Sequence, residues 1–296
     1  MWRRGEWMKR ILSLPGKRNL ILGDRPLVMG IVNLTPDSFF PDSRVPGPAL
    51  AVERALKLLE EGANILDFGA ESTRPGSAAV GPEEEIKRLI PALRAFRARS
   101  GAVVSVDTRR AEVAKAALDE GADIVNDIAA LSDPGMATLV ARSGAGLVLM
   151  HMLGEPQTMQ ENPVYGDCAV EVAAYLCAAA AKALDAGVSK DSIILDPGIG
   201  FGKTLEHNLD LIKRLYLVAE CGYPVLVGLS RKRFIGEISG KPVEQRLAGS
   251  LGAACAAWLG GADIIRVHDV EETKDALALF RACAPVQAYP DRAMRM

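Results

Sequence analysis

Polar side chains that could take part in chemistry recur in this chain directly after short apolar runs. The run 193–195 is followed by Asp196, then by the loop Pro197-Gly198-Ile199-Gly200-Phe201-Gly202, and a helical pattern begins near Leu205. A carboxylate at the end of a buried strand requires hydrogen-bond donors, and alternate glycines let a flat ligand approach the backbone. The Walker phosphate loop does not fit, because Pro197 stands where its first glycine would be. A tight β-to-α turn without a ligand is the alternative interpretation.

Two cationic side chains near the end of the chain could bind an anion. Arg266 and His268 are two positions apart in a strand-like pattern, so their side chains leave the same face. Together with Asn33 and the pair Thr73-Arg74 they could form a pocket for phosphate or pyrophosphate. The alternative is that Arg266 pairs with an acidic side chain at the surface.

Asp107 and Asp196 could serve as general bases, as metal ligands or as acceptors for a heterocycle. The remaining histidines, His151 and His207, lie in separate segments, so the sequence predicts no zinc site. A carboxylate that accepts two parallel N–H bonds, next to the amide of Asn126 and the ammonium of Lys232, suits a flat heterocycle better. His151 is explained equally well by packing and by a role in the site. No serine or cysteine nucleophile stands in a catalytic pattern, which argues against covalent acyl transfer.

The elements that must position these residues alternate regularly. Eight times a short Val/Ile/Leu run is followed by a polar or glycine-rich loop and then by a helical pattern. The expected strands are 28–33, 64–69, 103–107, 124–126, 147–151, 193–196, 225–229 and 263–268. The expected helices are 49–61, 82–97, 110–120, 135–143, 168–186, 205–219, 243–259 and 270–283. Strands that are apolar on both sides, in eight such units, predict an α/β fold with a single (β/α)8 TIM barrel.

The candidate site residues follow the carboxyl ends of these strands, which meet at one end of a barrel. The long insertions 35–48 and 152–166 follow the first and fifth strands, and we expect them to cover a substrate. The turn pair Gly23-Asp24 predicts a hairpin between 20–22 and 27–31, the second arm being the first barrel strand. We therefore expect residues 1–18 to form an N-terminal extension and 19–296 to form the barrel domain.

Composition limits the class of protein. The 296 residues carry a net charge of −2, so no overall field attracts nucleic acid or an acidic membrane. The basic N-terminus is not followed by an apolar run of secretory length, and no segment is long enough to span a bilayer. Five cysteines without a Cys-x-x-Cys pair indicate small core residues kept as thiols in a reducing compartment. These features predict a cytoplasmic protein.

Taken together, the chain resembles the pterin-binding TIM-barrel family of dihydropteroate synthases from residue 30 to residue 270. Seven segments carry the resemblance, and they stand in the order of the family. They are Asn33-Leu34-Thr35-Pro36-Asp37-Ser38-Phe39, Glu71-Ser72-Thr73-Arg74-Pro75-Gly76, Ser105-Val106-Asp107-Thr108, Val125-Asn126-Asp127-Ile128, the loop from Asp196 to Lys203, Ser230-Arg231-Lys232-Arg233-Phe234-Ile235-Gly236, and Arg266-Val267-His268-Asp269. Departures are Leu34, where the family usually has Val, Phe40-Pro41, where it often has Ser-Asp, and Arg233, where a small residue is common.

The resemblance implies a transferase that joins 6-hydroxymethyl-7,8-dihydropterin pyrophosphate to p-aminobenzoate in folate biosynthesis. It implies that Asp107, Asn126, Asp196 and Lys232 bind the pterin, and that Thr73, Arg266 and His268 lie near the phosphates. It places Arg74, Pro75, Phe201 and Ser230 around p-aminobenzoate, and Asn33 on the Mg²⁺ that accompanies pyrophosphate. Asp107, Asp196, Lys232, Arg266 and His268 would be catalytic, in an SN1-like displacement assisted by Mg²⁺. The family habit also suggests a homodimer, with no nucleic-acid or membrane partner.

Two other functions are compatible with parts of the pattern. A methyltransferase acting on a methylated reduced folate would need the same carboxylate and amide groups, but it would have no use for Arg266-x-His268. A barrel that binds a pterin or a phosphate without catalysis, as a sensor, would not release pyrophosphate.

Overall fold

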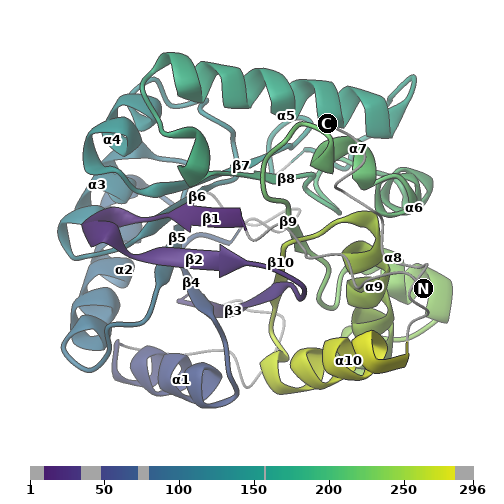
Figure 1. Ribbon diagram of the computed structural model, residues 1–296, viewed down its shortest axis with the longest axis horizontal. Coiled ribbons are helices and arrows are strands. Elements are labelled where there is room, and N and C mark those ends of the chain that lie inside the picture. Colours follow the sequence, from purple (N-terminus) through teal and green to yellow (C-terminus); the bar gives the residue numbers. More distant parts are fainter. Residues whose placement is uncertain (1–9, 35–47, 73–79, 157, 284–296) are drawn as a thin grey trace, which may run out of the picture.

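Eight parallel strands form the centre of the molecule, and helices surround them (Figure 1). The computed structural model describes residues 10–34, 48–72, 80–156 and 158–283. The barrel strands are β3 (Leu27–Asn33), β4 (Ile65–Gly69), β5 (Val104–Asp107), β6 (Ile124–Asp127), β7 (Gly146–Met150), β8 (Ile193–Asp196), β9 (Leu226–Gly228) and β10 (Ile264–Val267). They pair in the order β8-β7-β6-β5-β4-β3-β10-β9, and a parallel bridge between Leu195 and Val225 joins β8 to β9. The predicted (β/α)8 barrel is confirmed.

The helices bury an apolar face on the outside of the strands. They are α1 (Pro48–Glu60), α2 (Pro82–Arg97), α3 (Ala111–Asp119), α4 (Met136–Ser143), α5 (Cys168–Asp185), α6 (Leu205–Lys213), α7 (Tyr216–Ala219), α8 (Arg233–Ser239), α9 (Leu247–Gly260) and α10 (Val270–Cys283). The expected helix 205–219 is broken into α6 and α7, and α8 was not predicted. None of the helices in the described ranges is long and apolar enough to cross a bilayer.

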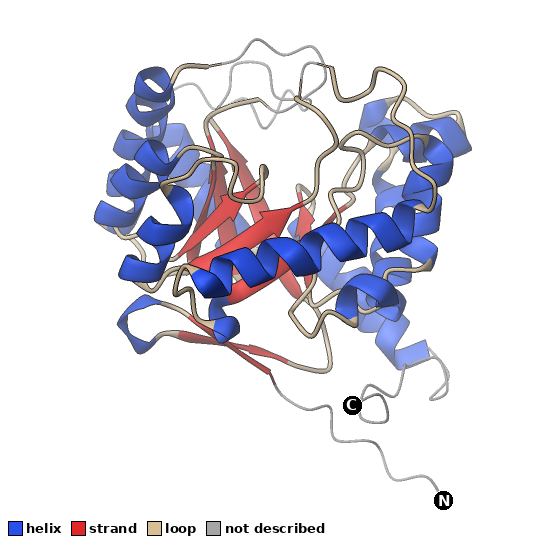
Figure 2. Cartoon of the chain, turned by 90° about the horizontal axis from the view of Figure 1, so that it is seen from above, coloured by secondary structure: helices blue, strands red, loops and turns tan. Residues whose placement is uncertain are grey.

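A two-stranded antiparallel hairpin covers the amino-terminal end of the barrel (Figure 2). It consists of β1 (Arg10–Ser13) and β2 (Asn19–Leu22). Its side chains Leu12, Leu14 and Leu22 pack against the innermost apolar layer of the barrel. That layer contains Met29, Ile65, Ile124, Val148, Ile194, Leu226 and Ile264.

The expected pairing across Gly23-Asp24 is wrong, because β2 pairs with β1 and not with β3. Strand β3 already has parallel neighbours on both edges, β10 and β4, so it offers no edge to β2. The hairpin straddles residue 18, and the division of the chain at that residue stays a prediction.

The expectation that all five cysteines are thiols is also wrong, since Cys177 of α5 and Cys221 form a disulfide. Helix α5 packs against α7, and this packing brings the two Cα atoms to 5.8 Å although the residues are 44 positions apart. Cys168, Cys255 and Cys283 are free.

Candidate active site

Polar side chains occupy two successive inward-facing layers at the carboxyl end of the barrel. Alternate residues of a strand share a face, so the positions two residues beyond the apolar layer also point inward. On β4, β5, β6, β8 and β10 these are Asp67, Ser105, Asn126, Asp196 and Arg266, which we call the lower layer. Two residues further along the chain, at or just beyond the strand ends, lies the upper layer, which consists of Asn33, Asp107, Ser230 and His268. The barrel therefore brings together nine polar residues from separate segments of the chain.

Arg266 is the centre of the lower layer. Its Nε donates to Asp67 Oδ2 at 2.6 Å, and its Nη2 donates to Asp107 Oδ2 at 2.9 Å. The alternative partners at the surface are thus excluded for Arg266, which pairs inside the barrel. Burial raises the pKa of Asp107, Arg266 opposes that rise, and the carboxylate of Asp67 adds to it.

Asp196 and Lys232 form the opposite side of the lower layer. Asp196 is 5% exposed, and its Oδ1 accepts a hydrogen bond from the backbone N–H of Gly198 at 2.7 Å. Burial raises the pKa of Asp196, and the nearby ammonium of Lys232 opposes that rise. The same ammonium lies 4.6 Å from the ring centroid of Phe201 and donates to the carbonyl of Ile199. Burial lowers the pKa of Lys232 to about 8, with Asp196 opposing.

His268 and Ser230 belong to the upper layer and contact one another. His268 Nδ1 is 3.0 Å from Ser230 Oγ, and the backbone N–H of His268 donates to the same oxygen at 3.3 Å. Burial, and after it the charge of Arg266, lowers the pKa of His268 to about 3. In the ligand-free site, burial and Arg266 therefore favour the neutral imidazole of His268 near pH 7.

Arg231 holds the loop that carries Ser230 and Lys232 in place. Arg231 has a left-handed backbone, with φ of 57°, which is uncommon for a residue other than glycine. Its guanidinium binds both carboxylate oxygens of Asp269, at 3.0 and 2.6 Å, and its backbone N–H donates to Ser250 Oγ at 2.8 Å. These contacts tie the loop after β9 to the residue that follows His268.

The glycines of the loop after β8 are required by the chain itself. Gly198 has φ of 64°, and a Cβ there would overlap the carbonyl oxygen of His151. Gly202 has φ of 63°, and a Cβ there would lie 2.5 Å from the carbonyl oxygen of Leu153. The sequence suggested that these glycines let a flat ligand approach. At both positions the missing Cβ instead leaves space for the backbone of the segment that follows β7.

Side chains from neighbouring segments hold the carbonyls of this loop. Lys203 Nζ donates to the carbonyl of Phe201 at 2.9 Å and lies 3.0 Å from His151 Nδ1. Gln160 donates to the carbonyl of Gly200 at 2.6 Å, and Tyr165 donates to that of Gly202 at 2.8 Å. His151 is 6% exposed, as packing requires, and it contacts Lys203, which lines the candidate site. Gln160 and Tyr165 lie in the insertion 152–166, which contacts the loop after β8 through these bonds, and its role in covering a substrate stays a prediction.

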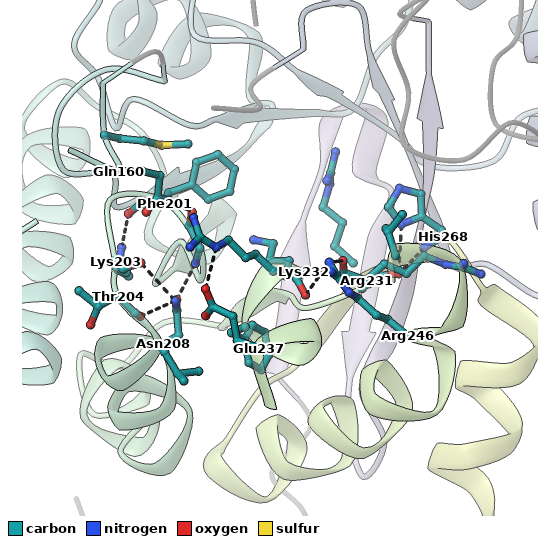
Figure 3. A pocket seen from close by; sticks show the side chains of 18 of the residues that line it. Gln160, Phe201, Lys203, Thr204, Asn208, Arg231, Lys232, Glu237, Arg246 and His268 are labelled. Atoms are coloured by element: carbon teal, nitrogen blue, oxygen red, sulfur yellow. Dashed lines mark hydrogen bonds and ion pairs between the residues drawn. The ribbon is translucent and has the colours of Figure 1, made fainter. Parts of the chain in front are cut away.

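A cavity of about 890 Å³ opens above these layers, between the loop after β8 and the loops after β9 and β10 (Figure 3). Seven of the predicted site residues line it, namely Asn33, Asp107, Phe201, Ser230, Lys232, Arg266 and His268. In Figure 3, Phe201, Lys203 and Asn208 lie on one side, and Arg231, Arg246 and His268 lie on the other. Asn126 and Asp196 belong to the lower layer, beneath this cavity.

Thr73, Arg74 and Pro75 lie outside the described residues, but the base of their segment is defined. Arg110 binds Glu71 at 2.9 Å and also donates to the carbonyl of Val80 at 2.7 Å. Val80 N–H in turn donates to Glu71 Oε1 at 3.3 Å. Both ends of the segment therefore meet next to the cavity, which Glu71 and Ser72 line.

The oxygen donors at the cavity fit a magnesium ion that is coordinated mainly by the phosphate oxygens of a bound substrate and by water. In the described ranges no three His, Cys, Asp or Glu residues form a metal cluster. The amide of Asn33 lines the cavity. Its Oδ1 and Asp107 Oδ2 both lie near Gly69, at 3.9 and 3.8 Å from the position that a Cβ of this residue would take. Mg²⁺ commonly takes one or two protein oxygens together with phosphate oxygens and water. A single hard oxygen from Asn33 is consistent with that mode.

Several residues that shape the site were given no role from the sequence. Asp67 and Gln160 were not named, and Lys203, Arg231 and Asp269 were named only within the segments that carry the resemblance. Asp67 carried a usable signal, because a carboxylate within the apolar stretch Leu66–Phe68 costs free energy unless it is paired. The others lie in loops or loop ends, where no periodicity indicates what a side chain contacts.

Comparison with known proteins identifies relatives along nearly the whole chain. Residues 29–268 match the family described as pterin binding enzyme. Dihydropteroate synthase from Neisseria meningitidis serogroup C is 50% identical over 264 residues, which is 88% of this chain and 93% of that protein.

Solved structures agree with this result. The dihydropteroate synthase of Xanthomonas albilineans with 4-aminobenzoic acid has a TM-score of 0.86 and 44% identity, covering 94% of this chain and 100% of that one. The Burkholderia cenocepacia enzyme complexed with 7,8-dihydropteroate has a TM-score of 0.82 and 41% identity, covering 93% of this chain and 96% of that one.

Proposed function

The chain belongs to the dihydropteroate synthases, pterin-binding transferases of folate biosynthesis, and on that premise we propose how its cavity acts. The substrates would be 6-hydroxymethyl-7,8-dihydropterin pyrophosphate and p-aminobenzoate, and the products dihydropteroate and pyrophosphate. The structures of relatives named as complexes with 4-aminobenzoic acid and 7,8-dihydropteroate support this choice of ligands.

The observation that carries the proposal is the charge of the lower layer and its immediate surroundings. Three carboxylates, Asp67, Asp107 and Asp196, stand around two cations, Arg266 and Lys232. With all five groups ionised the net charge is −1. Fixed charges in a site with little water stabilise an opposite charge that develops during a reaction.

A pterin over this layer would ionise by loss of its leaving group. The bond between the methylene carbon and the pyrophosphate oxygen breaks, and both electrons leave with the oxygen. The positive charge spreads from the methylene into the electron-rich ring, where Asp107 and Asp196 stabilise it. The amine nitrogen of p-aminobenzoate then bonds to the methylene and loses a proton, so no covalent enzyme intermediate is required.

The pyrophosphate would lie toward the upper layer. Asn33 would hold the Mg²⁺ that accompanies it, and when bound this ion would neutralise negative charge on the leaving group. His268 would donate a hydrogen bond as a neutral imidazole, while Arg266 joins the two layers. Thr73 is proposed near the same phosphates on the resemblance alone.

The p-aminobenzoate would bind between the loop after β8 and the loop after β9. Phe201 offers a ring face there, and Ser230 lines the same cavity. Arg74 and Pro75 are assigned to this substrate by resemblance.

An assay of pyrophosphate release tests the proposed activity. Purified protein with both substrates and Mg²⁺ should release pyrophosphate and form dihydropteroate, and omitting p-aminobenzoate should abolish dihydropteroate formation. Deuterium on the reacting methylene should slow the chemical step measurably, because that carbon becomes trigonal in an SN1-like ionisation. Pyrophosphate release without an isotope effect on the chemical step would support a direct displacement, and binding without release would contradict the enzymatic function.

The homodimer stays a prediction from the resemblance, and the cytoplasmic location stays a prediction from the composition. Sedimentation of the purified protein at several concentrations would test the first, and cell fractionation the second.

A further inference from the structure

One charged residue of the lower layer has no role in the reaction proposed above beyond its charge. Asp67 is fully buried at the centre of β4, 199 positions before Arg266 in the chain. Its carboxylate contacts two residues assigned to the substrates, with Oδ2 accepting from Arg266 Nε at 2.6 Å and from Asn126 Nδ2 at 3.2 Å.

These contacts determine which way the Asn126 amide faces. An ionised carboxylate can only accept hydrogen bonds, so the amide atom next to Asp67 must be the nitrogen. The amide oxygen Oδ1 of Asn126 is then left for another donor. It is buried, and within the described part of the chain no group donates to it. An unsatisfied buried oxygen of this kind costs roughly 1–3 kcal/mol until a donor reaches it.

Asp67 also restrains Arg266. The guanidinium is held at two of its nitrogens, by Asp67 on one side and Asp107 on the other. Two fixed partners leave a planar group little freedom to rotate, and the plane is thereby set before any ligand binds.

We propose that Asp67 is a positioning residue for pterin recognition, which fixes Asn126 as a hydrogen-bond acceptor and holds Arg266 in the plane that contacts the ligand. The proposal rests on the function proposed above. Asp196, Asp107 and Asn126 then all present acceptor oxygens, which selects a heterocycle whose facing edge carries N–H donors. A heterocycle with lone pairs at that edge would meet acceptors only.

The test compares two variants in which a buried aspartate bound to an arginine is replaced by asparagine. In Asp67→Asn the introduced amide keeps its size, but its nitrogen competes with that of Asn126, and the Asn126 amide is expected to turn its nitrogen toward the ligand. Asp123→Asn is the matched control, since Asp123 is equally buried and pairs with Arg97 at 2.7 Å, but it directly precedes β6 at the amino-terminal end of the barrel, away from the site. Calorimetry with 6-hydroxymethyl-7,8-dihydropterin, which lacks phosphate, measures the effect.

We expect Asp67→Asn to lose about tenfold or more in affinity for this pterin, with an unchanged KM for p-aminobenzoate, because one charge-assisted hydrogen bond is involved. Asp123→Asn should bind the pterin within about twofold of the wild-type protein. The swap Asp67→Asn/Asn126→Asp restores an amide-to-carboxylate bond and again presents an acceptor at position 126, so it should regain affinity relative to Asp67→Asn.

Wild-type affinity in Asp67→Asn, or a swap that binds no better than Asp67→Asn, would overturn the proposal. If Asp67→Asn does not fold, the swap is compared with the wild-type protein, and a loss of more than about a hundredfold would count against it. Failure of the proposed function shows separately, since the wild-type protein would then release no pyrophosphate.

Discussion

Replacing Gly198 by Ala tests whether the loop after β8 is shaped by the chain rather than by a ligand. Gly198 has φ of 64°, a conformation that costs an L-residue about 1–2 kcal/mol. The new Cβ would also overlap the carbonyl oxygen of His151 and lie 3.1 Å from its carbonyl carbon, both backbone atoms that cannot rotate away. Forcing such an overlap typically costs about 1–3 kcal/mol more, so we expect a total loss of about 2–5 kcal/mol.

Gly222→Ala separates the two contributions. Gly222 has φ of 85°, but a Cβ there would have no heavy atom within 4 Å. This variant should lose only the conformational part, about 1–2 kcal/mol. Equilibrium unfolding in urea gives both values, and the difference between the variants measures the cost of the contact with His151.

Pterin binding provides the second measurement. The Gly198 N–H donates to Asp196 at 2.7 Å, so displacing this residue removes a donor that orients the carboxylate. Gly198→Ala should therefore weaken binding of a phosphate-free pterin, and Gly222→Ala should not. Equal losses of stability in the two variants, or unchanged pterin affinity in Gly198→Ala, would refute the reasoning.

Three further predictions follow from single interactions. Arg266→Ala removes the partner that the fully buried Asp67 shares with the partly buried Asp107, so the free energy of unfolding should fall by about 3–5 kcal/mol, and less in Arg266→Lys. Unchanged stability in urea would contradict this. Burial lowers the pKa of Lys232 to about 8, so its ammonium is present below that pH and lost above it. The affinity for a pterin, measured by calorimetry, should therefore fall as the pH rises through 8. Lys232→Arg should show no such fall, because a guanidinium stays charged in this range. Iodoacetamide should modify three cysteines in the unreduced, unfolded chain and five after reduction, as counted by mass spectrometry. Five modified cysteines without reduction would show that Cys177 and Cys221 are not joined.

The barrel and the end that carries its site could be predicted because both depend on local patterns. A continuous apolar run followed by a helical period repeats eight times, and each pattern is set by its own residues. The polar residues at strand ends, such as Asp107 and Asp196, are local features as well. Parallel strands around a barrel place their carboxyl ends together whatever the loops between them do.

Pairing between distant residues could not be predicted in the same way. The turn pair Gly23-Asp24 led us to pair β2 with β3, and the pairing with β1 becomes clear only when β10 and β4 occupy the edges of β3. Likewise Cys177 and Cys221 meet because α5 packs on α7, which no spacing along the chain indicates.

The sequence by itself thus determined which residues reach the carboxyl end of the barrel, whereas the tertiary structure decided their chemical state. Arg266 was identified as a cation, but its partners Asp67 and Asp107 are 199 and 159 positions away. His268 was identified as a phosphate contact, but burial and Arg266 make it neutral. The physical reason is that side-chain direction follows from the two-residue period of a strand, while charge and hydrogen-bond polarity depend on desolvation and on neighbours that only the closed barrel assembles.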